Sequence, residues 1–89
     1  MEQTQTELIE KIVPDTSVII EGLVSKKIAS GEMEVESILI HEAVIAELEH
    51  QSNINKTIGF LGLEEIERIK KLSEEKKFTV SFAGLRPRA

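Results

Sequence analysis

The sequence contains no cysteine, tryptophan or tyrosine, and only two prolines in 89 residues. Without cysteine the chain can form no disulfide, no thiol nucleophile and no cysteine-ligated zinc site. Three phenylalanines are its only aromatic residues, so a core drawn from the 40% of hydrophobic residues must be aliphatic. The net charge of −5 argues against a simple basic nucleic-acid-binding protein, which presents a positive face.

Long hydrophobic runs are also absent. No apolar stretch approaches the roughly 20 residues of a membrane span, and the N-terminus lacks the pattern of a signal peptide. We therefore expect a cytoplasmic protein. The length of 89 residues is that of one domain.

The hydrophobic pattern predicts strands and helices in the order β-α-β-α-α-β. A polar leader over residues 1–10 precedes a strand that ends at about Pro14. The second and third strands are expected at Ile38–Ile40 and Phe78–Phe82. Because strands separated by helices pair in parallel, the sequence predicts an α/β fold with a parallel sheet.

The first helix is expected to run from Ser17, as N-cap, to about Ala29, with Gly31 ending it. The second begins at His41 or Glu42 and ends at about His50, followed by a loop over residues 51–55. The third stretch runs from about Thr57 to Lys76, and two glycines within it predict a break into two pieces. Two i,i+4 ion pairs are expected on its exposed face: Glu64–Arg68 and Glu67–Lys71.

Asp15 is the only aspartate among sixteen acidic residues, and it follows the end of the first strand. Open α/β sheets place their chemistry beyond the carboxyl ends of strands, where a short, stiff side chain suits a fixed position. A carboxylate there can bind a hard divalent cation, with the hydroxyls of Thr16 and Ser17 orienting it or holding metal-bound water. The alternative is structural, because Asp, Thr and Ser commonly form turns and cap helices.

Glu47 is the second candidate. It lies four residues after Ala43, so it shares a helix face with a small residue and can reach the end of the first strand if the second helix packs across it. The alternative is an ordinary solvated glutamate.

Three segments in order resemble the PIN-domain family, named from the PilT N-terminus: Ile12–Ile20, Ala43–Leu48 and Asn55–Glu65. The third resembles the archaeal subgroup in which a PIN domain is fused to a P-loop ATPase and a KH domain. The resemblance implies a three-layer α/β/α fold, here with about three strands in the order 3-2-1.

Most members of this family are ribonucleases that depend on Mg²⁺ or Mn²⁺. The resemblance therefore implies hydrolysis of phosphodiester bonds in single-stranded RNA. It makes Asp15 and Glu47 metal-binding and catalytic residues, with Thr16 and Ser17 as supporting polar residues.

Two departures from the family pattern matter. His41 stands where the family often has proline, which concerns helix capping more than chemistry. No aspartate follows Asp15, although the family completes its acidic cluster with later aspartates. We therefore expect residues 1–89 to be the N-terminal part of one PIN-like domain, with weak metal binding and little activity. Its first strand would be an exposed edge, which favours self-association.

Two other functions remain open. The chain can be a catalytically inert, PIN-like interaction or oligomerisation module that helps to assemble a P-loop ATPase. It can also be a phosphatase with a nucleophilic aspartate at a strand end. The haloacid-dehalogenase pattern for that chemistry needs a second aspartate two residues later, where this sequence has Ser17.

Overall fold

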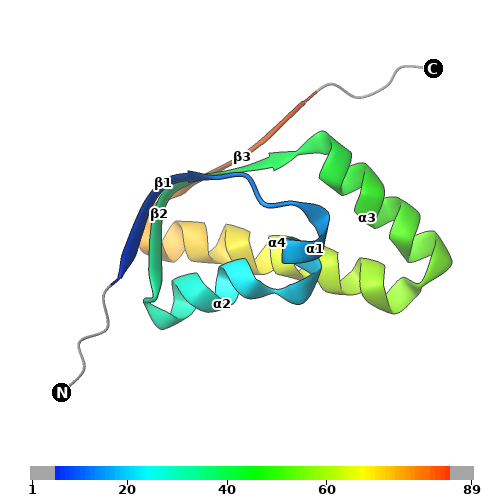
Figure 1. The fold of residues 1–89 in the computed structure, drawn as a ribbon, viewed down its shortest axis with the longest axis horizontal. Coiled ribbons are helices and arrows are strands. Elements are labelled where there is room, and N and C mark those ends of the chain that lie inside the picture. The colour runs from blue at the N-terminus through cyan, green and yellow to red at the C-terminus, as the bar shows by residue number, and fades with distance from the viewer. Residues whose placement is uncertain (1–5, 85–89) are drawn as a thin grey trace.

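The computed structural model describes residues 6–84. Three strands are separated by two pairs of helices along this part of the chain (Figure 1). None of the described helices is long and apolar enough to cross a membrane. In chain order the elements are β1 (Glu7–Ile12), α1 (Thr16–Glu21), α2 (Leu23–Ser30), β2 (Met33–His41), α3 (Glu42–Ile54), α4 (Lys56–Lys76) and β3 (Thr79–Ala83).

The strands form one parallel sheet in the spatial order β1-β2-β3. Ile38 in the central strand pairs with Ile12 on one side and Val80 on the other. This arrangement confirms the predicted α/β class, the parallel pairing and the strand order. Figure 1 shows α2 and α4 packed beside the sheet, while α3 extends from the carboxyl end of β2.

The strand boundaries differ from those predicted. β1 begins at Glu7, inside the expected leader, and ends at Ile12, before Pro14. β2 covers nine residues, not only Ile38–Ile40. Its first half contains Glu34 and Glu36, both exposed, which obscured the strand in the hydrophobic pattern.

The first predicted helix is two helices, because Gly22 interrupts it with a φ of 72°. This left-handed conformation suits glycine, and it ends α1 and begins α2. The predicted helix end at Gly31 is confirmed, with a φ of 85° at the C-cap.

Two other helix predictions were wrong, and packing explains both. α3 continues to Ile54, so Asn55 alone connects it to α4. The side chain of Asn55 caps α4 by accepting a hydrogen bond from the Thr57 amide at 3.0 Å.

The second error concerns α4, which is one continuous helix despite its glycines. Gly59 and Gly62 face α3, and a Cβ on either would collide with Ser52 or Leu48. The glycines therefore allow close packing of α3 and α4.

The core between the helices and the sheet is aliphatic, as the composition predicted, with a single aromatic side chain at its margin. Its buried hydrophobic residues are Ile19, Val24, Ile28, Met33, Ile38, Ile40, Val44, Leu48, Ile66, Ile69 and Phe78.

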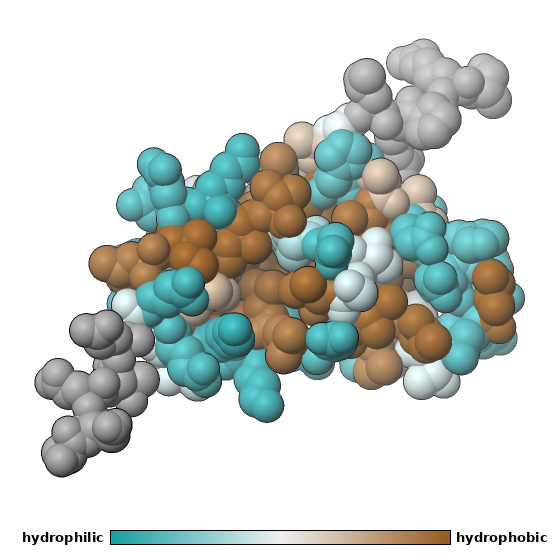
Figure 2. Space-filling model, viewed as in Figure 1, coloured by the Kyte–Doolittle hydropathy of each residue, from teal (hydrophilic) through white to brown (hydrophobic). Residues whose placement is uncertain are grey.

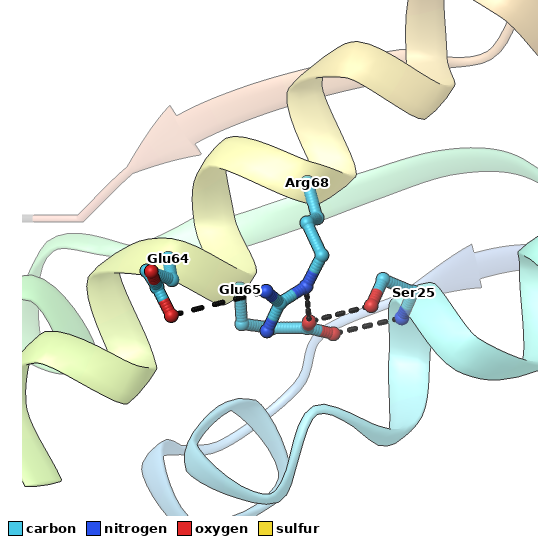
Figure 3. A network of polar contacts seen from close by, with 4 residues as sticks. All are labelled: Ser25, Glu64, Glu65 and Arg68. Atoms are coloured by element: carbon cyan, nitrogen blue, oxygen red, sulfur yellow. Dashed lines mark hydrogen bonds and ion pairs between the residues drawn. The ribbon is translucent and has the colours of Figure 1, made fainter.

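One carboxylate is buried with this core. Glu65 in α4 is 0% exposed, and its Oε2 and Oε1 accept hydrogen bonds from the amide and hydroxyl of Ser25 at 2.7 and 2.6 Å (Figure 3). Arg68 donates to the same carboxylate at 3.3 Å. The N-cap of α2, Gly22, has no side chain to cap the helix. Glu65 therefore supplies the acceptor that the first turn of α2 lacks within its own sequence.

We predict that Glu65→Ala lowers the free energy of unfolding by roughly 3 kcal/mol, because it leaves the Ser25 donors buried without an acceptor. The measurement is urea unfolding followed by circular dichroism. Glu64→Ala is the matched control, since Glu64 is 44% exposed and lies 3.9 Å from Arg68; its cost should stay within about 0.5 kcal/mol. Similar costs for the two variants would refute this account of Glu65.

Candidate metal centre

The four residues predicted to form a site lie together. Asp15, Thr16 and Ser17 follow β1, while Glu47 lies on α3, which begins directly after β2. All four line one shallow depression of about 490 Å³, completed by Ala43 and Val44. The depression lies beyond the carboxyl ends of parallel strands, where open α/β sheets bind ligands.

Asp15 is also a helix cap. Its Oδ1 accepts hydrogen bonds from the Val18 amide at 3.1 Å and the Ser17 hydroxyl at 3.2 Å. The prediction of Ser17 as the N-cap is therefore wrong, because α1 begins at Thr16 and Asp15 caps it. Oδ2 of Asp15 receives no hydrogen bond from residues 6–84. Capping therefore occupies one carboxylate oxygen and leaves the other available to a ligand.

Glu47 is held by a residue that the sequence analysis missed. Gln51 Nε2 donates to Glu47 Oε2 at 3.1 Å, across one turn of α3. The i,i+4 spacing of the two residues was a visible signal for this contact. Like Asp15, Glu47 has one oxygen engaged within the protein, so both carboxylates can offer a single oxygen to the depression.

The oxygen atoms of this site are of the type that binds Mg²⁺ or Mn²⁺, but there are too few of them for tight binding. Carboxylate and hydroxyl oxygens are suitable hard ligands, and monodentate carboxylates suit Mg²⁺. Nowhere in residues 6–84 do three or more acidic, histidine or cysteine side chains gather in a metal-binding arrangement. Two exposed carboxylates alone do not make a tight divalent-metal site.

His41 takes a structural position, as its departure from the family pattern suggested. Its Nδ1 accepts a hydrogen bond from the Ala43 amide at 3.0 Å, and this caps α3. The ring therefore fixes the start of the helix that carries Glu47.

The fold and the depression define an α/β protein with two carboxylates at the carboxyl edge of a parallel sheet, as the resemblance to PIN domains implied. No family model matches the chain. The chain is 36% identical over 78 residues to the "Uncharacterized KH and PIN-domain containing protein MJ1533" of Methanocaldococcus jannaschii. The match covers 88% of this chain and 12% of that protein.

A solved structure from the same archaeon has a similar fold. It is described as a domain of a functionally unknown protein, and it matches with a TM-score of 0.76 and 35% sequence identity. The match covers 88% of this chain and 56% of the solved domain. The first relative is named for KH and PIN domains, in agreement with the resemblance to PIN-domain proteins, and the second shows that the fold is shared with a solved archaeal domain.

The capping role of Asp15 can be separated from any role in metal binding. Asn is as good an N-cap as Asp, so Asp15→Asn should change the free energy of unfolding by only a few tenths of a kcal/mol. Asp15→Ala should cost about 1 kcal/mol, because the Val18 amide loses its acceptor. Denaturant unfolding in metal-free buffer measures both, and equal stability of the two variants would contradict the capping role.

Proposed function

We propose that this chain is the N-terminal part of a PIN-type, metal-dependent ribonuclease domain. The observation that carries the proposal is the meeting of Asp15 and Glu47, from separate elements, at one depression beyond the sheet. The relative with KH and PIN domains supports the same class. In this proposal the two carboxylates are metal ligands, and Thr16 and Ser17 support them.

The rest of the acidic site lies, in our proposal, on further elements of the domain. The chain spans 56% of the solved domain that it resembles, so the remainder of that domain has no counterpart here. A divalent metal held by a complete site would supply a water of lowered pKa and neutralise charge on the scissile phosphate. Asp15 and Glu47 would each present one oxygen to it.

RNA is the substrate that this class implies, in single-stranded form. The KH domain named in the relative is consistent with RNA binding by the whole protein. We include a P-loop ATPase domain as a further proposed neighbour, on the resemblance of Asn55–Glu65 to that archaeal subgroup.

We predict that the 89-residue chain binds Mn²⁺ weakly and does not cleave single-stranded RNA, whereas a longer protein containing the whole domain does. Mutation of a residue that only hydrogen-bonds to a metal ligand typically costs roughly 10–100-fold in metal affinity or activity, and loss of a ligand itself should cost more. Asp15→Asn or Glu47→Gln in the longer protein should therefore reduce cleavage by at least about 100-fold. The measurements are Mn²⁺ titration by electron paramagnetic resonance and cleavage of a labelled oligonucleotide.

Two results would overturn parts of this proposal. Metal-dependent cleavage by the 89-residue chain, abolished by Asp15→Asn, would show that two carboxylates suffice. A longer protein that neither binds Mn²⁺ at Asp15 nor cleaves RNA would favour the inert interaction module.

Self-association is a separate proposal and rests on β1. Among the described residues β1 pairs with β2 alone, so its outer edge has unpaired backbone groups. Leu8 in β1 is 75% exposed, and Val13, directly after the strand, is 55% exposed. Figure 2 shows apolar surface on the side of the molecule where β1 lies. An unpaired, partly apolar edge readily pairs with another chain.

We expect sedimentation velocity to show oligomers whose population grows with concentration. Leu8→Lys should shift the chain towards monomer, because a charged residue on an edge strand opposes pairing. Lys56→Glu, a charge change on α4 far along the chain, is the control. A single monomeric species across a hundredfold range of concentration would contradict the proposal.

A further inference from the structure

A second surface feature lies between α2 and α4 and shares no residue with the candidate metal centre. It is a groove of about 340 Å³, and almost all of its lining surface is apolar. This volume falls within the lower part of the range typical of ligand pockets, enough for one or two aliphatic side chains. Its lining residues are Ser25, Lys26, Ala29, Arg68, Lys71 and Leu72.

The charged residues that line this groove are all positive, although the chain carries a net charge of −5. Arg68 is engaged by Glu64 at 3.9 Å and Glu65 at 3.3 Å. Lys26 and Lys71, one on each wall, form no ion pair with any residue of 6–84. The two lysines are therefore available to a partner.

The ion pairs on α4 explain why the ammonium group of Lys71 is available to a partner. The sequence predicted an ion pair between Glu67 and Lys71, and this prediction was wrong. Glu67 instead lies 3.8 Å from Lys70, whose ammonium also lies over the ring of Phe82 at 5.5 Å. Lys71 thus faces the groove, where its aliphatic stem extends the apolar lining and its ammonium remains in solvent.

An apolar groove with two unpaired ammonium groups at its rim matches a ligand with aliphatic and acidic groups side by side. A nucleic-acid strand would satisfy the lysines but would leave the apolar surface uncovered, because bases bind by stacking on aromatic rings. No phenylalanine lines the groove. The chemistry therefore favours a peptide over a nucleic acid.

We propose that the α2–α4 groove is a docking site for an acidic segment of a protein partner. An aliphatic side chain of that segment fills the space over Ala29 and Leu72, and flanking carboxylates meet Lys26 and Lys71. The proposal does not depend on nuclease activity, because the groove and the depression at Asp15 are lined by different residues.

The probe is a fluorescein-labelled peptide of twelve residues, made of glutamate and alanine with two leucines one helical turn apart. Fluorescence anisotropy measures its binding to the 89-residue chain. The double variant Lys26→Glu with Lys71→Glu should weaken binding at least tenfold. Lys11→Glu with Lys56→Glu changes the net charge equally, at exposed sites outside the groove, and should leave the affinity within about threefold.

The apolar half of the proposal has its own variants. Ala29→Gln places a polar side chain over the groove at an exposed helical position, and should weaken binding several-fold without unfolding the chain. A peptide with serine in place of both leucines should bind as weakly. Thermal unfolding of each variant verifies that the fold is retained.

Three outcomes would overturn the docking site. Equal loss of binding in the two double-lysine variants would mean that only the overall charge matters. Insensitivity to Ala29→Gln and to the leucine-to-serine change would remove the apolar contact. Tighter binding of a twelve-residue uridylate oligonucleotide than of the peptide, lost in the Lys26/Lys71 variant, would make the groove a nucleic-acid surface.

Discussion

The buried carboxylate of Glu65 holds together the helices on which the other features depend. It joins α4 to the first turn of α2 through both donors of Ser25, in a position from which water is excluded. A buried charge is costly unless it is fully hydrogen-bonded, so this contact specifies one arrangement of the two helices. The groove between α2 and α4 lies directly beside it, since Ser25 belongs to both. α1, which Gly22 joins to α2, packs against α4 as well.

On its other side α4 fixes α3, and thereby Glu47. Gly59 and Gly62 remove the side chains that would separate the two helices, and Asn55 alone connects them. His41 caps α3 at the end of β2, so the helix starts at the sheet edge. Asp15 caps α1 at the same edge. Two caps and one helix pair therefore bring Asp15 and Glu47 to a single depression. At Asp15 the structural role and the proposed metal-binding role coincide, because capping uses Oδ1 and leaves Oδ2 available.

Several parts of the fold could be predicted from local signals. The apolar runs ending near Pro14 and at Ile38–Ile40 indicated parallel strands, and Gly31 indicated a helix end. The predictions from the sequence were wrong where residues distant in the chain determine the local conformation or the burial of a side chain. Gly22 reads as an ordinary helical residue until its left-handed conformation is seen, and Gly59 reads as a helix breaker until α3 is seen against it. Glu65 was indistinguishable from the solvated glutamates around it, because its partner Ser25 lies 40 residues away.

The sequence by itself determined the class of fold, the aliphatic core and the candidate residues Asp15, Thr16, Ser17 and Glu47, because strand and helix periodicities and the family motifs are local patterns. Only the tertiary structure decided that these four side chains share one depression, that Asp15 rather than Ser17 is the helix cap, and that Lys71 faces a groove instead of pairing with Glu67. The reason is physical. Which oxygen or ammonium remains available depends on the partners that packing brings close to it. Those partners come from other elements, or are chosen between adjacent residues of one helix, as Lys70 is chosen over Lys71 by Glu67.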